Sequence, residues 1–298
     1  MVGPPVWSRE LLGRCDFPQP GAGAVACAVS GGADSLALLV LAVAAGLAVT
    51  AIHVDHGLRE GSAEEALVVK AAATDLGAGF ESRAVVVAPG PNLEARARTA
   101  RYAALPPGVM TGHTADDLAE TMLINLLRGA GRDGLSPMRA NDRVARPLLR
   151  LRRAETHALC TASGLVAVDD ASNADARFTR NRVRAELLPL MADIAGRDPV
   201  PVLVRQAGYL GAEAALLDDL AERVDPTDAR AAATGPEPVV RRAIRTWLRA
   251  GEADHHPPSA AEVDRVLAVI RGHATACELS GGRTVRRSQG RLTVTPGG

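Results

Sequence analysis

Short apolar runs alternate with longer helical patterns over the first 127 residues of the chain. The runs are rich in Val and Ala, and the stretches between them repeat apolar residues every three or four positions. We expect strands at Val25–Val29, Val49–Val54, Arg83–Val87 and Val109–Thr111, and helices at Asp34–Ala45, Ser62–Leu76, Asn92–Leu105 and Ala115–Leu127. This strand–helix repeat predicts an α/β fold with a doubly wound parallel sheet, in which ligands bind beyond the carboxyl ends of the strands.

Beyond residue 150 the pattern is mainly helical. Helices are predicted at Leu151–Ser163, Asn181–Ile194, Pro199–Val224, Val239–Ala250 and Ala260–Arg271, followed by a Gly281-Gly282 turn between short strands. Glycine and proline interrupt the helical pattern at residues 196–199. We therefore predict a larger domain over residues 1–195 and a smaller, mainly helical domain over residues 196–298.

Composition excludes several classes of protein. With 47% apolar and 23% charged residues the chain can build a core. Its longest apolar run, Leu36 to Val49, is too short to span a bilayer and contains Gly46, and the N-terminus lacks the order of a secretory signal. We expect a cytoplasmic protein without a membrane partner. The four cysteines have no Cys-x-x-Cys spacing, which argues against a disulfide framework or a metal–thiolate site.

Charge is unevenly distributed along a chain whose net charge is zero. Residues 128–184 contain twelve arginines and six acidic residues, a net charge of +6. Arginine suits bidentate phosphate contacts and base stacking, so this stretch predicts an RNA or nucleotide face. The chain has a single lysine, Lys70. A general preference for arginine therefore explains the residue type but not the clustering.

The first predicted strand ends in Ser30-Gly31-Gly32-Ala33-Asp34-Ser35. Two glycines allow close backbone approach to an anion, the following helix directs unpaired N–H groups at it, and the two serines add hydroxyl donors. No Gly-Lys-Ser/Thr follows, so this is not a Walker sequence. The hexapeptide predicts a phosphate-binding loop. The alternative is a simple strand–turn–helix corner with Asp34 as N-cap.

The second strand ends in His53-Val54-Asp55-His56-Gly57-Leu58-Arg59. Neighbouring residues of a strand point to opposite faces, which argues against a metal site built from this run. A nucleotide-binding or structural loop is the better interpretation.

The fourth strand leads through Gly112 and His113 into a helix that ends near Arg128. Asp117 and Glu120 share one face of its first turns, near the positive end of the helix dipole. They could accept a substrate ammonium or hold Mg²⁺ near ATP phosphates. The alternative is a helix capped by Asp116 with solvated carboxylates.

Taken together, these segments resemble the tRNA(Ile)-lysidine synthetases, a family within the PP-loop ATP pyrophosphatases, whose catalytic domain is adenine nucleotide α-hydrolase-like. The resemblance covers roughly residues 22 to 190. Besides the three segments above, it includes Leu-Leu-Arg-Gly at 126–129, Arg-Pro-Leu-Leu at 146–149, Asp170-x-Ser172-Asn173, and Arg180-Asn181-Arg182-Val183-Arg184. The chain is similar to the short form of the family, which has one small C-terminal domain that binds tRNA.

The resemblance implies an ATP-dependent carbon–nitrogen ligase. ATP adenylates C2 of the wobble cytidine in a tRNA(Ile) with a CAU anticodon, and free lysine then displaces AMP to give lysidine. It also implies pyrophosphate release, Mg²⁺ as a cofactor, a homodimer and a cytoplasmic location.

The resemblance further implies roles for individual residues. Those expected to bind ATP are Ser30, Gly31, Gly32, Asp34, Ser35, His53, Gly112 and His113, with Asp34 also contacting Mg²⁺. Those expected in catalysis are Asp34, Asp117, Glu120 and Arg128. Those expected to bind tRNA or substrate are Asp55, His56, Arg59, Arg180, Asn181, Arg182 and Arg184.

Other readings stay open at this point. Related tRNA thiolases need catalytic or cluster-binding cysteines, and residues 112–129 contain none. Amide-forming relatives need a glutaminase cysteine near the N-terminus, which is also missing here. A non-catalytic nucleotide- or RNA-binding module would bind its ligands without turnover.

Overall fold

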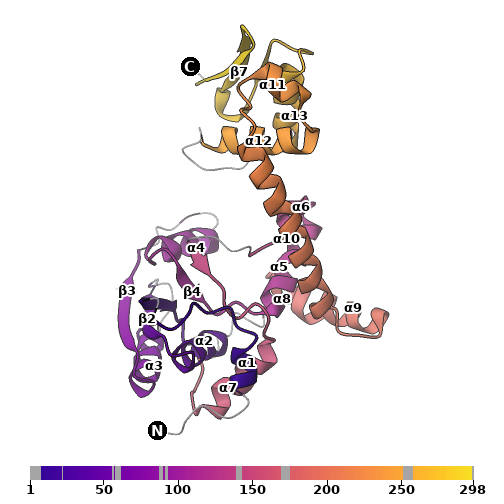
Figure 1. Cartoon of the computed structure of the whole chain (residues 1–298). Coiled ribbons are helices and arrows are strands. Elements are labelled where there is room, and N and C mark those ends of the chain that lie inside the picture. Colours follow the sequence, from indigo (N-terminus) through magenta and orange to yellow (C-terminus); the bar gives the residue numbers. More distant parts are fainter. Residues whose placement is uncertain are drawn as a thin grey trace. The chain divides into compact units, whose positions relative to one another are not determined.

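The computed structural model describes residues 8–21, 23–55, 57, 62–86, 90, 93–138, 143–168, 175–250 and 258–296. Its contacts divide the chain into two compact units, Met1–Gly208 and Tyr209–Gly298 (Figure 1). The division falls inside helix α10 (Val200–Glu222). The boundary expected after residue 195 stays a prediction. None of the described helices is long and apolar enough to cross a membrane.

The first unit is built on a five-stranded parallel sheet in the order β3-β2-β1-β4-β5. The strands are β1 (Ala24–Ala28), β2 (Ala48–Asp55), β3 (Gly79–Ala84), β4 (Val109–Thr111) and β5 (Val144–Ala145). Strand order reverses between β1 and β4, which are hydrogen-bonded neighbours. In a sheet of this type the crevice at such a reversal is the expected ligand site. It is where the Ser30–Ser35 loop and the Gly112 loop begin.

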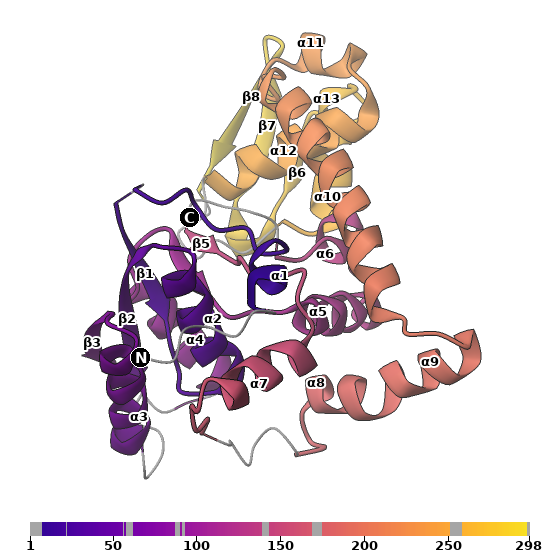
Figure 2. The ribbon, with the colours of Figure 1, turned by 60° about the horizontal axis from the view of Figure 1, so that its bottom comes forward.

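Helices cover both faces of this sheet (Figures 1 and 2). The helices of this unit as far as residue 162 are α1 (Ser8–Leu12), α2 (Ala33–Ala44), α3 (Ser62–Asp75), α4 (Leu93–Ala103), α5 (Ala115–Leu127), α6 (Arg132–Leu135) and α7 (Arg153–Ala162). Four leucines of α2 are fully buried between the sheet, α3 and α7. On the opposite face Ile52 and Val109 pack with Leu105 and Val144. The predicted α/β, doubly wound architecture is confirmed.

A broken helix after residue 178 covers one side of α5. It consists of α8 (Thr179–Arg182), a π-helical turn at Val183–Leu187 and α9 (Leu188–Ala195). Pro189 has no N–H to continue an ordinary helical ladder, and the Leu188 amide bonds five residues back to the Val183 carbonyl. Val183 and Leu188 pack on Ala119 and Leu123 of α5.

The second unit has its own core. It contains α11 (Ala229–Thr234), α12 (Glu237–Ala250) and α13 (Ala260–Ile270), with an antiparallel sheet of β6 (Ala276–Glu278), β7 (Thr284–Ser288) and β8 (Arg291–Thr295). Ile244, Leu248, Val266 and Val285 form the centre of this core. Gly281 and Gly282 turn the chain between β6 and β7, both with positive φ, as the double glycine predicts.

The sequence pattern misplaced one strand and missed several short elements. Strand β3 begins at Gly79, four residues before the predicted start. It lies at the sheet edge and is largely exposed, so its polar sequence carries no apolar run. Strand β5 and helices α1, α6 and α11 span two to six residues, too few to show a period.

Candidate active site

The Ser30–Ser35 loop forms a tight turn between β1 and α2. Gly31 has a φ of +89°, a conformation that favours glycine. The Ser35 hydroxyl accepts a hydrogen bond from the Ser30 amide (3.1 Å) and donates one to the Gly32 carbonyl (2.8 Å). Gly32 is the N-cap of α2, and Asp34 stands inside the first turn. The N-cap interpretation of Asp34 is therefore wrong, and its carboxylate is available for other contacts.

Gly112 brings the end of β4 against this loop. A methyl group at Gly112 would lie 2.6 Å from the Asp34 carbonyl oxygen, so only glycine permits the approach. The first and third motifs therefore meet through backbone contact, as expected from their positions at neighbouring strand ends.

Asp34 points away from the loop backbone toward α7. Its carboxylate accepts a short hydrogen bond from the Thr156 hydroxyl and lies 3.4 Å from Arg153 Nε. Burial raises the pKa of Asp34, and the Thr156 hydroxyl and Arg153 only partly oppose that effect. A cation beside this carboxylate is thus electrostatically favourable.

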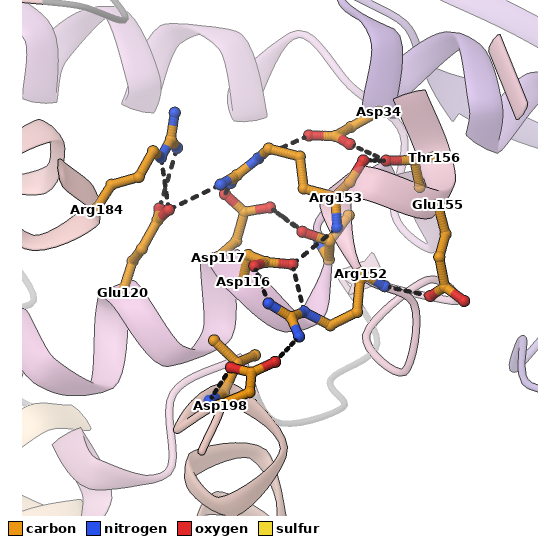
Figure 3. A network of polar contacts seen from close by, with 12 residues as sticks. Asp34, Asp116, Asp117, Glu120, Arg152, Arg153, Glu155, Thr156, Arg184 and Asp198 are labelled. Carbon is orange, nitrogen blue, oxygen red and sulfur yellow. Dashed lines mark hydrogen bonds and ion pairs between the residues drawn. The ribbon is translucent and has the colours of Figure 1, made fainter. Parts of the chain in front are cut away.

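Arg153 is the centre of the site (Figure 3). Its Nη2 donates to Asp117 Oδ1 (2.8 Å) and its Nη1 to Glu120 Oε1 (2.9 Å), in addition to the contact with Asp34. We call these four residues the Arg153 cluster. Burial lowers the pKa of Arg153, but the carboxylates outweigh it, so the pKa lies above its usual value and the guanidinium is permanently charged.

Asp117 is held by neutral donors as well as by Arg153. Its Oδ2 accepts from the amide (2.9 Å) and the hydroxyl (3.0 Å) of Thr114, the N-cap of α5. Burial tends to raise the pKa of Asp117, but Arg153 and the Thr114 amide hold it below its usual range. Asp117 is ionised at neutral pH.

Glu120 is fully buried and surrounded by guanidinium groups. Besides Arg153, Arg184 donates to both of its oxygens (2.7 and 3.2 Å), and Arg180 Nε lies 3.7 Å away. The π-helical turn carries Arg184, so the irregular helix directs this side chain at Glu120.

Asp116 forms a second ion pair next to the Arg153 cluster. It accepts two hydrogen bonds from the Arg152 guanidinium (3.1 and 2.9 Å) and one from the Arg153 amide (2.8 Å). Arg152 also makes a short contact with Asp198. Asp116 therefore does not cap α5. The alternative of a helix that is capped by Asp116 and carries solvated carboxylates is wrong.

A cavity of about 250 Å³ opens beside Glu120. Three carboxylates and three guanidinium groups line it, together with one apolar wall. They are Asp116, Glu120, Asp198, Arg152, Arg153 and Arg184, with Leu188, Pro189, Ala192, Pro199 and Val200. We call this cavity the charged pocket. Its balanced charges suit a small ligand that carries both signs.

His53 lies at the end of β2, behind the phosphate loop, and is 2% exposed. Its Nδ1 lies 3.1 Å from the Val29 carbonyl, so this nitrogen carries the proton. The buried Nε2 has no hydrogen-bond partner within the part of the chain that the structure describes. Asp55 closes a turn by accepting from the Gly57 amide (2.8 Å). His56 and Arg59 lie outside the described residues.

His113 follows Gly112 and contacts the Thr111 hydroxyl through Nδ1 (2.8 Å). Burial lowers the pKa of His113 to about 4, against the opposing charge of Asp117. His113 is therefore neutral at pH 7, a state suited to hydrogen bonding rather than to charge neutralisation.

The predicted basic residues do not all converge. Arg180 and Arg184 reach Glu120, whereas Arg182 is exposed and pairs with Glu186 (2.8 Å). Asn181 donates to the Asp175 carbonyl (2.9 Å). Arg128 is exposed at the far end of α5, roughly 20 Å from the start of that helix at 1.5 Å per residue.

Sequence reasoning missed Arg152, Arg153, Thr156 and Asp198. One signal was present, since two adjacent arginines stand at the start of a helix. Cations there face the positive end of the helix dipole, an unfavourable placement that implies nearby carboxylates. Four carboxylates gathered at one site also require counter-ions.

Comparison with known proteins identifies the families that this chain resembles. The PP-loop domain family matches residues 12–191, and the family described as the TilS substrate binding domain matches residues 230–293. A tRNA(Ile)-lysidine synthase of Nocardia farcinica is 41% identical over 303 residues, covering 92% of this chain and 93% of the relative. One of Mycolicibacterium paratuberculosis is 48% identical over 241 residues, covering 76% and 74%.

Among solved structures, a U34-tRNA thiolase from Methanococcus maripaludis superposes with a TM-score of 0.55 at 15% identity, over 69% of this chain and 78% of that one. At this identity the similarity concerns the fold alone.

Proposed function

The chain belongs to the tRNA(Ile)-lysidine synthase family, and from this premise we propose that it joins free lysine to C2 of the wobble cytidine of a tRNA(Ile) with a CAU anticodon. In the first step the C2 carbonyl oxygen attacks the α-phosphorus of ATP and pyrophosphate leaves. In the second step the lysine amine attacks C2, loses a proton, and AMP departs as the C2–O bond breaks. The observation that carries the assignment is the Arg153 cluster, which joins the phosphate loop to a charged pocket.

The Ser30–Ser35 loop is proposed to hold the departing pyrophosphate. Its support is the glycine-rich turn at a helix start and the close approach of Gly112. His53 Nε2 is buried without a hydrogen-bond partner among the described residues, and His113 is a neutral imidazole. The two histidines stand at the ends of the strands that flank β1, and they are proposed to bind ATP.

Mg²⁺ fits this loop through Asp34. Within the described residues no group of three His, Cys, Asp or Glu side chains could hold a metal alone. A Mg²⁺ site often combines one or two carboxylates with substrate phosphates, and the raised pKa of Asp34 favours a cation there. When bound, the ion would neutralise charge on the polyphosphate.

Free lysine is proposed to bind at Asp117 and Glu120, in and beside the charged pocket. Lysine carries two ammonium groups and one carboxylate, and the site offers both carboxylates and guanidinium groups. Because its lowered pKa keeps Asp117 ionised, this carboxylate suits the binding of an ammonium.

The RNA is proposed to contact the exposed arginines that follow residue 175 and the C-terminal unit. Arg182 is the clearest example, because among the described residues it pairs only with an exposed glutamate, Glu186. A homodimer and the participation of Arg128, Asp55, His56, Arg59 and Asn181 are further proposals of the family resemblance.

Sulfur transfer has no support from the cysteines. Burial raises the pKa of Cys15 and of Cys27 to about 12, and it raises the pKa of Cys160 and Cys277 as well. None of these thiols is a ready nucleophile at neutral pH.

The test is incubation of the full chain with ATP, Mg²⁺, radiolabelled lysine and the CAU-anticodon tRNA(Ile). We expect label in that tRNA, with one AMP and one pyrophosphate formed per lysine, and no label in the same tRNA carrying uridine at the wobble position. Asp34→Ala should form neither AMP nor pyrophosphate while keeping its circular dichroism spectrum. AMP release with another substrate and no lysine incorporation would overturn the assignment.

A further inference from the structure

We propose that Arg153 is a stand-in cation: it occupies the carboxylates of the lysine site until ATP draws it toward the phosphate loop, so that ATP strengthens lysine binding. This inference rests on the proposed function, because it takes lysine as the ligand of Asp117 and Glu120. It adds an order of binding and a residue that couples the two substrates.

The geometry gives Arg153 contacts on both sides. Three nitrogens of one guanidinium face three carboxylates, at 3.4 Å for Asp34, 2.8 Å for Asp117 and 2.9 Å for Glu120. Asp34 belongs to the phosphate loop helix, whereas the other two stand on α5 (Figure 3). Arg153 therefore lies on the lysine side, with its loosest contact toward ATP.

An incoming ammonium needs the same oxygens that Arg153 uses. Asp117 Oδ1 accepts from Arg153, and its other oxygen accepts from the amide and the hydroxyl of Thr114. Within the described part of the chain Asp117 has no second ion pair. As long as Arg153 is in place, lysine must compete with a guanidinium held by two strong, partly buried hydrogen bonds.

Bound ATP changes this balance. Its polyphosphate places several negative charges beside Asp34, and guanidinium groups pair well with phosphate oxygens. Movement of Arg153 toward them would leave the neutral Thr114 donors as the only hydrogen-bond partners of Asp117 among the described residues, with Arg180 as a more distant positive charge. Glu120 would keep Arg184 on both oxygens. Asp117 would then be a partly uncompensated buried carboxylate, which an ammonium stabilises.

Linkage turns this exchange into a measurable quantity. If ATP raises the affinity for lysine, lysine raises the affinity for ATP by the same factor. We expect a factor of at least about five, at the low end of common coupling energies.

The experiment is calorimetric titration of the full chain with L-lysine, with and without Mg²⁺ and a non-hydrolysable ATP analogue blocked between the α and β phosphates. In Arg153→Gln we expect lysine to bind at least about fivefold more tightly without the analogue, and the analogue to change its affinity by less than about twofold. A purely structural role for Arg153 predicts weaker binding instead. Arg14→Gln is the matched control, because Arg14 pairs with Glu155 of the same helix but belongs neither to the Arg153 cluster nor to the charged pocket, and it should keep the coupling.

Each outcome decides the matter. Tighter binding with lost coupling supports the inference, whereas unchanged coupling or weaker binding in a folded Arg153→Gln overturns it. If that variant does not fold, Arg153→Lys replaces it, since a compact ammonium cannot contact three carboxylates at once and should reduce the coupling. Wild-type protein that incorporates lysine without coupling overturns the inference alone. Failure to bind or incorporate lysine at all overturns the proposed function and the inference with it.

Discussion

Two buried glutamates, one in each unit, are stabilised in opposite ways. Glu120 lies in the first unit, which holds the candidate active site and which we call the catalytic unit, and it is surrounded by Arg153, Arg180 and Arg184. Glu262 in the C-terminal unit accepts four hydrogen bonds of 2.7–2.8 Å from the amides and hydroxyls of Ser259 and Ser280. These neutral donors are fixed by the backbone, so Glu262 forms a rigid hydrogen-bonded link between the start of α13 and the turn after β6. Guanidinium groups on long side chains can exchange with other cations, which a ligand site needs and a structural link does not.

The largest expected effect comes from Glu120→Gln. Removal of the charge leaves three arginines without their shared partner and should destabilise the catalytic unit by about 3 kcal/mol. We take the low end of the range because Arg180 and Arg184 are 38% and 34% exposed and can turn to water. Lysine incorporation should fall more than about 100-fold. Glu186→Gln, at an exposed glutamate, is the control and should leave both measurements unchanged. Normal incorporation by Glu120→Gln would remove the distinction between the two glutamates.

Glu262→Gln should have a smaller effect, and one on stability alone. An amide NH₂ would face two donors from Ser259 or Ser280, at a cost of about 2 kcal/mol. Chemical denaturation should show the loss in the C-terminal transition, while lysine and ATP-analogue affinities stay constant. The exposed Glu278 of the same region provides the matched Glu→Gln control. A change in ligand affinity would mean that Glu262 is more than a structural link.

The arginines after residue 178 divide in a similar way, into an exposed one, Arg182, and one paired with a buried carboxylate, Arg184. Arg182→Glu should weaken tRNA binding roughly tenfold and lower its salt dependence by about one unit of slope, because an exposed arginine has phosphate as its natural partner. Arg184→Glu should instead lower lysine affinity, because it removes a guanidinium of the charged pocket that could pair with the lysine carboxylate. Filter binding of tRNA and calorimetry of lysine separate the two. Equal losses of tRNA affinity in both variants would contradict the sorting.

Acidification should destabilise the two units at different pH values. We expect this loss of stability to be smaller than the effects of the substitutions above. Burial lowers the pKa of His113 from an ordinary 6.5 to about 4, so the unfolded chain binds its proton more tightly. The stability of the folded unit that depends on a neutral His113 is therefore fully present above pH 6.5 and is lost as the pH falls toward 4. The Ser280 and Ser259 donors lower the pKa of Glu262 from 4.5 to about 2, and that contribution is lost only between those values.

Thermal melts from pH 7 to 5.5 should therefore lower the midpoint of the catalytic unit by roughly 2–4 °C while that of the C-terminal unit stays. His113→Asn should remove this early loss. A simultaneous decline of both units would show that His113 does not set the acid response.

Sequence patterns predicted the fold and half of the site. The strand–helix repeat placed the Ser30–Ser35 loop and Gly112 at neighbouring strand ends, and helical spacing placed Asp117 and Glu120 together. Arg153 and Thr156 were not predictable in this way. They contact Asp34 across more than 100 residues of chain, and the side-chain reach of α7 depends on packing against α2 rather than on any local period.

The π-helical turn at Val183–Leu187, just before Pro189, determines the direction in which Arg184 points. Relative to an ordinary α-helix, a π turn inserts one residue of rotation, roughly 100°, between the side chains on either side of it. Arg184 stands inside that turn, and Leu188, which follows it, packs against α5. With Leu188 held against α5, a regular α-helix would turn Arg184 away from Glu120, so the π turn determines that an arginine meets this buried carboxylate.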